Sequence, residues 1–171
     1  MKKTLLALAL FSGVISAANA YDGTINFEGS VLETACTATA AASTIQMGAI
    51  SKAALGTVGA TSLAKPVSVT LSACPAAAKT ATITFAGTPD ADNNQLFKVS
   101  AATGTAATGI GLALYEADGN TLITPNTISA EKALSENTAT VYNFTAKYMA
   151  TAATVTGGDA NVSTSFTVNY N

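Results

Sequence analysis

The stretch that decides the interpretation of this chain is Gly23-Thr24-Ile25-Asn26-Phe27-Glu28-Gly29-Ser30-Val31. Polar and non-polar positions alternate along it, so that Ile25, Phe27 and Val31 share one face of an extended chain with two glycines. A period of two is typical of a β-strand with one buried face. From the pattern alone, this stretch is predicted to be the first strand of its own domain.

The same alternation recurs along the rest of the chain, between turns marked by Gly, Pro, Asp and Asn. Many short strands of this kind predict an antiparallel sandwich and argue against a parallel α/β sheet. We expect short helical turns at residues 51–55 and 129–134, and a loop at residues 100–109. The alternating apolar positions are Val67, Val69 and Leu71; Ile83 and Phe85; Ile110, Leu112 and Leu114; Tyr142, Phe144, Ala146 and Tyr148; and Phe166, Val168 and Tyr170.

The residues before this first stretch have the organisation of a secretory signal peptide. Lys2 and Lys3 precede an apolar run over residues 5–14, and Ala18-Asn19-Ala20 supplies small residues at a cleavage site. The alternative, a buried N-terminal helix, fits these flanks less well. We therefore expect residues 1–20 to be removed and the exported chain to begin at Tyr21. No other apolar run approaches the roughly 20 residues that a membrane helix needs.

The charge composition excludes several classes of partner. Eight basic and ten acidic residues give a net charge of −2, and removal of Lys2 and Lys3 leaves six against ten, or −4. All the basic residues are lysines. A mildly acidic chain without clustered Lys or Arg is poorly suited to nucleic acid or to an anionic membrane surface.

Two cysteines, Cys36 and Cys74, remain in the exported chain. An even pair in an exported protein predicts one disulfide, and closing a loop of about 39 residues stabilises a fold by roughly 4 kcal/mol in the chain-entropy model. Because the chain has no His, a Cys–His nucleophile or a Cys/His metal site is excluded.

Other possible catalytic or metal-binding motifs are weak. Residues 62–65 and 129–132 both match S-x-x-K, but no S-D-N or K-T-G partner accompanies them. Asp90 and Asp92 lack the spacing of a calcium loop, so a solvated turn is the better interpretation. We expect no enzyme activity, no metal and no cofactor.

Several segments together resemble the chaperone–usher pilins of the type 1 fimbrial kind. The opening stretch 23–31 is followed by Cys36 and later Cys74, residues 142–150 are similar to the family's penultimate strand, and Gly158 falls where the family commonly has Gly. The ending Phe166-Thr167-Val168-Asn169-Tyr170-Asn171 carries the family's penultimate Tyr. The resemblance covers essentially the whole exported chain.

What the resemblance implies is an all-β, incomplete immunoglobulin-like sandwich that is completed by a donor strand from a neighbouring subunit. On this interpretation residues 21–31 are an N-terminal donor-strand extension and residues 32–171 are the pilin domain. A periplasmic chaperone fills the open groove first, and the next subunit replaces it at an outer-membrane usher. The expected donor residues are Tyr21, Gly23, Ile25, Phe27, Gly29 and Val31, and the expected chaperone-docking edge is Phe166, Val168, Tyr170 and Asn171.

The resemblance implies a structural subunit, the major shaft pilin of a fimbrium on the bacterial surface, which supports adhesion and takes other pilin subunits as partners. A minor or adaptor pilin with the same mechanism is one alternative, and a carbohydrate-binding adhesin is a second. A third is a self-contained immunoglobulin-like module, which would be a stable monomer when expressed alone.

Overall fold

The computed structural model describes residues 25–171. The expected signal peptide, together with Tyr21 and Gly23 of the expected donor strand, lies outside the described residues. Residues 32–171 form one compact unit, and residues 25–31 belong to a second unit that is described by itself.

Antiparallel strands dominate the compact unit, and its one helical element is a short 3-10 turn, η1 (Lys52–Leu55). No helix within residues 25–171 is long and apolar enough to cross a membrane. The strands are β1 (Thr37–Ala40), β2 (Lys65–Ser72), β3 (Thr80–Ala86), β4 (Phe97–Lys98), β5 (Ile110–Tyr115), β6 (Leu122–Ile123), β7 (Lys132–Ala133), β8 (Thr140–Ala150) and β9 (Ser165–Tyr170).

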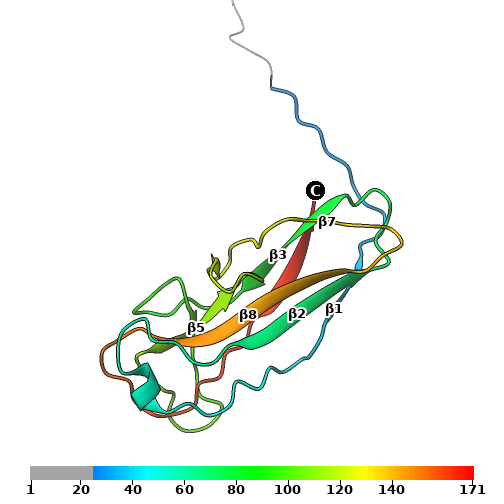
Figure 1. The fold of residues 1–171 in the computed structure, drawn as a ribbon. Coiled ribbons are helices and arrows are strands. Elements are labelled where there is room, and N and C mark those ends of the chain that lie inside the picture. The colour runs from blue at the N-terminus through cyan, green and yellow to red at the C-terminus, as the bar shows by residue number, and fades with distance from the viewer. Residues whose placement is uncertain (1–24) are drawn as a thin grey trace, which may run out of the picture. The chain divides into compact units, whose positions relative to one another are not determined.

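The strands form two sheets that pack face to face (Figure 1). The larger sheet has the order β1-β2-β8-β5-β4, with β6 also paired to β5, and the smaller sheet has the order β7-β3-β9. Every strand pairing is antiparallel. The antiparallel sandwich predicted from the alternating segments is therefore confirmed.

The core lies between the two sheets and is built from the residues with period two. Phe144 of β8 meets Phe85 of β3 edge to face, with ring centroids 4.9 Å apart and planes at 88°. Tyr142 is fully buried and its hydroxyl donates a hydrogen bond across the sandwich to the Ala81 carbonyl. Burial raises the pKa of this phenol above its ordinary value. The two sheets are thus joined by aromatic packing and by a buried polar contact.

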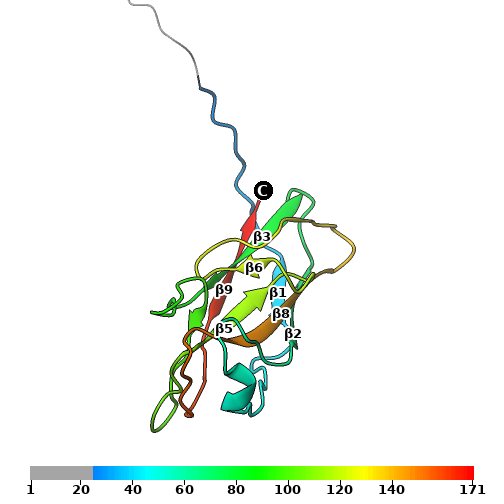
Figure 2. The same ribbon diagram turned by 60° about the vertical axis from the view of Figure 1, so that its left-hand side comes forward.

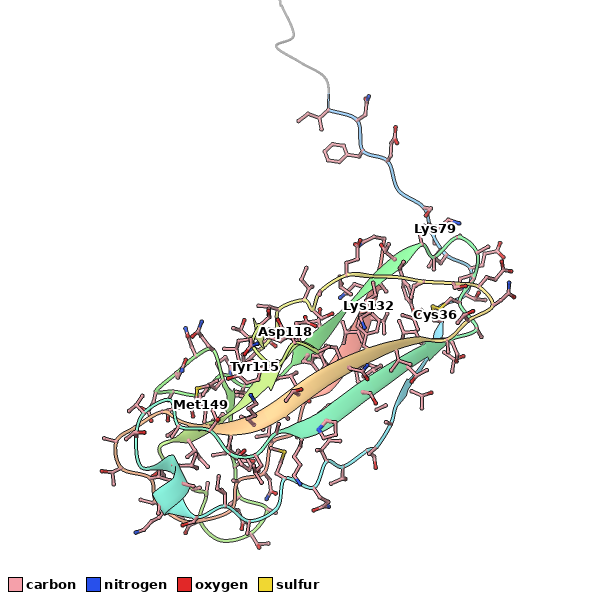
Figure 3. All side chains as sticks on the ribbon, viewed as in Figure 1. Cys36, Lys79, Tyr115, Asp118, Lys132 and Met149 are labelled. Carbon is pink, nitrogen blue, oxygen red and sulfur yellow. A yellow bond between two sulfur atoms is a disulfide. The ribbon has the colours of Figure 1, made fainter. Side chains whose placement is uncertain are left out.

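A disulfide joins Cys36, directly before β1, to Cys74, just after β2 (Figure 3). The Cys36 amide also donates a hydrogen bond of 3.1 Å to the Tyr170 hydroxyl at the end of β9. The predicted disulfide is present, and the same residue ties the start of one sheet to the end of the other.

Two local predictions differ from the structure. Residues 129–134 do not form a helical turn: they run beside β3 and include β7, because the buried Ser129 hydroxyl accepts a hydrogen bond from the Ile83 amide and Ser129 donates its own amide to the Ile83 carbonyl. Residues 25–31 form no strand. The turn expected at residues 51–55 is confirmed as η1.

Candidate functional site: an open groove along the last strand

β9 is an edge strand whose second side is free of strands within residues 25–171. Asn171 and Thr80 of β3 exchange both backbone hydrogen bonds, at 3.0 and 3.2 Å. In an antiparallel ladder, alternate residues direct both backbone groups to opposite sides. The N–H and C=O groups of Phe166, Val168 and Tyr170 therefore point away from β3, toward the open side.

The side chains of the same three residues point into the sandwich. Phe166, Val168 and Tyr170 alternate with exposed neighbours, and each packs against the core while remaining only partly buried. One set of residues thus presents unpaired backbone groups and incompletely covered apolar side chains together. An edge of this kind is a template for a further strand.

A groove of about 1000 Å³ opens beside this edge. One wall is formed by residues 40–50 and the other by residues 155–166, while the floor is the core itself. Val67 and Leu112 belong to inward-facing rows of their strands but are only partly buried. The apolar residues that line the floor are Val67, Val69, Phe85, Phe97, Ala107, Ile110, Leu112, Leu114, Ala146 and Tyr148.

The second wall is formed by the loop that leads into β9 (Figure 2). Hydrogen bonds to other segments of the sandwich hold this loop in place. Asn161 exchanges backbone hydrogen bonds of 2.8 and 2.9 Å with Ser100, so the chain is extended there as well. The Tyr148 hydroxyl donates a hydrogen bond to the Ala160 carbonyl, and burial raises the pKa of this phenol. The wall therefore runs as one extended edge from about residue 160 to the C-terminal strand.

The groove carries little charge. Among the residues that line it, only Lys52 and Asp159 are charged, and the others are apolar or uncharged polar residues. A charged ligand would lose its hydration here without finding a partner, which is costly. The geometry and the charge together suit an extended peptide that turns alternating apolar side chains into the groove and keeps any charged side chains on its other face.

Residues 25–31 of the N-terminal unit carry exposed apolar side chains at alternating positions. Ile25, Phe27 and Val31 are 79%, 93% and 97% exposed, and they are the apolar residues of the alternating stretch. A side chain added at Gly29 would meet no atom within 4 Å. Large apolar side chains exposed in a row are unusual in a protein that functions alone and indicate an interaction site.

The serines of the two S-x-x-K matches and the carboxylate of Asp90 have structural roles. The Ser62 hydroxyl accepts a hydrogen bond from the Tyr148 amide, and the Ser129 hydroxyl accepts one from the Ile83 amide. The Asp90 carboxylate caps the amides of Asp92 and Asn93 in a turn. Within residues 25–171 no group of three or more His, Cys, Asp or Glu residues is placed to hold a metal ion.

Sequence patterns did not identify the groove walls outside β9. Residues 37–42 and 150–156 are Ala- and Thr-rich and show no clear alternation, although β1 lies in the first run and part of the second wall in the other. The sequence feature that points to the site is the alternation in residues 23–31 and 165–170, where large apolar residues stand out from the many small ones.

Comparisons with known proteins agree on one family. The family model described as "Fimbrial protein" matches residues 25–171. The chain is 37% identical to the probable major fimbrial subunit LpfA of Escherichia coli O157:H7, over 99% of this chain and 97% of that protein. It is 36% identical to the type-1 fimbrial protein A chain of Salmonella typhi, with the same coverage of both chains, 99% and 97%.

Solved structures show the same fold. The crystal structure of an antigen and type I fimbria protein of Burkholderia pseudomallei matches with a TM-score of 0.61 and 33% identity, covering 86% of this chain and 97% of that one. The P pilus rod subunit PapA matches with a TM-score of 0.59 and 20% identity, covering 86% and 100%. These likenesses confirm the immunoglobulin-like sandwich expected from the resemblance.

Proposed function

The chain belongs to the fimbrial protein family, and we propose that it is the major shaft subunit of a chaperone–usher fimbria and polymerises by donor-strand exchange. As a fimbrial subunit it is exported and becomes a structural component of a fibre on the cell surface. The family consists of structural subunits that are in general not enzymes. Catalysis is accordingly no part of the function proposed for this chain.

The observation that carries the proposal is the double role of Phe166, Val168 and Tyr170. Their unpaired backbone groups and their partly buried side chains lie along the same open edge, and Phe166 also lines the groove. A strand added there would complete both the hydrogen-bonded ladder and the core. This is β-augmentation, in which main-chain hydrogen bonds supply affinity and pockets for alternate side chains supply specificity.

The occupant that fits is the N-terminal extension of another copy. Tyr21–Val31 has eleven residues, as many as β8, and spans roughly 36 Å when extended. Ile25 and Phe27 would enter the groove, and burying each would contribute about 1.5–3 kcal/mol. The glycines on the same face, Gly23 and Gly29, permit close approach where the groove is shallow.

Before assembly the groove needs another cover, because an open edge beside an exposed core promotes aggregation. A periplasmic chaperone that inserts its own strand would supply it, with Phe166, Val168, Tyr170 and the terminal carboxylate of Asn171 as the docking edge. An outer-membrane usher would then exchange the chaperone for the next subunit. This part of the proposal rests on the family resemblance and on the open edge.

A shaft role is favoured over a minor subunit by the relative described as a major subunit, at 37% identity. A minor or adaptor pilin remains the second candidate, since it would use the same groove and donor. The self-contained module is disfavoured because its core would be left open at the groove.

Two variants test the donor-strand mechanism. Deleting Tyr21–Phe27 should leave a subunit that still binds the chaperone but no longer extends a polymer, as judged by electron microscopy and size-exclusion chromatography. Joining a second copy of Gly23–Val31 through a flexible linker after Asn171 should give a stable, self-complemented monomer. Normal fibres from the deletion variant, or no stabilisation from the added copy, would show that the proposed mechanism is wrong.

A further inference from the structure

The groove wall formed by residues 155–164 is fixed by a contact between two loops that are distant in sequence. The Asp159 amide donates to the Thr105 carbonyl at 2.9 Å, and the Asp159 carbonyl accepts from the Ala107 amide at 2.8 Å. One carboxylate oxygen of Asp159 accepts from the amides of Ala102 and Thr103 at 3.2 and 3.4 Å. Four hydrogen bonds of one residue thus tie the wall to residues 102–107.

Gly158 makes the tightest part of this contact. A Cβ built on Gly158 would lie 2.5 Å from the Thr105 carbonyl oxygen and 2.7 Å from backbone atoms of Ala106 and Ala107. Because these neighbours are backbone atoms, they cannot rotate away as a side chain would. We call the contact of Gly158 and Asp159 with residues 102–107 the clasp.

The adjacent glycine provides a matched comparison. A Cβ built on Gly157 would meet no atom within 4 Å. Gly157 and Gly158 therefore have the same chemistry and nearly the same place in the chain, but only Gly158 depends on having no side chain. Both residues also line the groove.

The clasp lies behind the part of the wall that is not a strand. On its inner side are Val155, Ala160 and Val162, which pack against the cluster around Leu55, Ile110 and Tyr148 at this end of the groove. β9 is held by six residue pairs with β3, whereas this section is held by two isolated pairs, Thr156 with Thr108 and Asn161 with Ser100, by the Tyr148 hydroxyl and by the clasp. A shift of the clasp would therefore move this end of the groove and leave the β9 end in place.

We propose that Gly158 and Asp159 are positioning residues that set the width of this end of the groove and thereby how firmly the terminal apolar residue of the donor strand is held. The inference rests on the proposed donor-strand mechanism and adds residues to it. It concerns one end of the donor only, because the clasp supports one end of the groove only.

The test uses fibres assembled from the full chain and compares Gly158→Ala with Gly157→Ala. Polymer dissociation in guanidinium chloride is measured by size-exclusion chromatography, alone and combined with Ile25→Ala or Val31→Ala in the donor. We expect Gly158→Ala to speed dissociation at least tenfold and Gly157→Ala to change it less than twofold. The effect of Gly158→Ala should largely disappear in combination with one of the two donor variants and persist with the other.

Coupling of Gly158→Ala to only one end of the donor distinguishes a positioning role from a general loss of fold stability. Equal coupling to both ends of the donor, or to neither, would overturn the inference. If Gly158→Ala gives no fibres, Asp159→Asn is used in its place, since it keeps the shape and removes the charge; we then expect a smaller acceleration, about threefold, with the same one-sided coupling. Failure of the donor mechanism itself would give a different result: the chain lacking Tyr21–Phe27 would then still form fibres.

Discussion

Residues 25–31 and β9 alternate apolar and polar side chains in the same way, but only β9 is paired with another strand. β9 has β3 on one side and the core beneath it, so its apolar residues are partly buried. In residues 25–31 the corresponding residues Ile25, Phe27 and Val31 are almost wholly exposed. Under the proposed mechanism, alternation therefore indicates that a segment has a face to bury, but not in which copy of the chain its partner lies.

The largest expected effect comes from breaking the exposed segment. Phe27→Asp should abolish fibre formation, because a carboxylate cannot be buried in the apolar groove without a large cost. Asn26→Asp places the same charge on the opposite face of the segment and should assemble nearly normally. Electron microscopy and sedimentation of the polymer measure both. Equal defects in the two variants would contradict the assignment of Phe27 to the buried face.

A second expectation concerns the disulfide between Cys36 and Cys74. Cys36→Ser removes the disulfide and should lower the free energy of unfolding by roughly 4 kcal/mol. Urea unfolding of the self-complemented monomer measures this loss, with Cys74→Ser as the matched variant. The two variants should be alike, because each removes the same bond. Unchanged stability in either would contradict a structural role for the bond.

A third test separates the two sides of β9 with proline, which has no amide proton. Thr167 directs its amide to β3, so Thr167→Pro should destabilise the monomer by about 1–3 kcal/mol through an unsatisfied ladder group. Val168 directs its amide to the open side, where an edge strand tolerates proline. Val168→Pro should therefore weaken the polymer more than the monomer. Urea unfolding of dilute monomer and polymer dissociation are compared, and the opposite order would reverse the assignment of the two sides.

The smallest expected effect concerns the far end of β9. Tyr170→Phe removes only the hydroxyl that accepts the Cys36 amide and should cost about 0.5–1.5 kcal/mol. The aromatic ring remains in place, so assembly should continue. Thermal unfolding of the monomer checks the loss, and Tyr170→Ser, which also removes the ring, should be clearly worse. A loss of assembly in Tyr170→Phe would mean that the hydroxyl has a further role.

Much of the sandwich was predictable because its longer strands show a clear alternation of apolar and polar residues. β9 occupies residues 165–170, and β2, β3, β5 and β8 contain the alternating residues that were singled out. The two-residue strands β4, β6 and β7 were not predicted, since two residues show no period. Residues 129–134 were mistaken for a helical turn because the hydrogen bond between Ser129 and Ile83 links positions 46 residues apart, which local pattern cannot reveal.

The site was only partly accessible to sequence. Alternation and family resemblance pointed to the three inward residues of β9, which share one partly buried face of that strand, and one of them, Phe166, lines the groove. The wall at residues 40–50 and the clasp were missed, because their contribution comes from contacts with distant backbone. The family resemblance singles out Gly158, but no local pattern in Thr156-Gly157-Gly158-Asp159 gives the physical reason, which appears only when residues 105–107 are placed against it.

The division between an extended segment and an open edge in one chain has a consequence for symmetry. An interface that joins two different surfaces of identical copies is heterologous, and unless its rotation closes a ring it repeats without limit. Under the proposed mechanism every junction is such an interface, so no two-fold axis can relate neighbouring subunits. The resulting polymer is polar: one end exposes an unused N-terminal segment and the other an unfilled groove. Growth and capping at the two ends must therefore depend on different molecules.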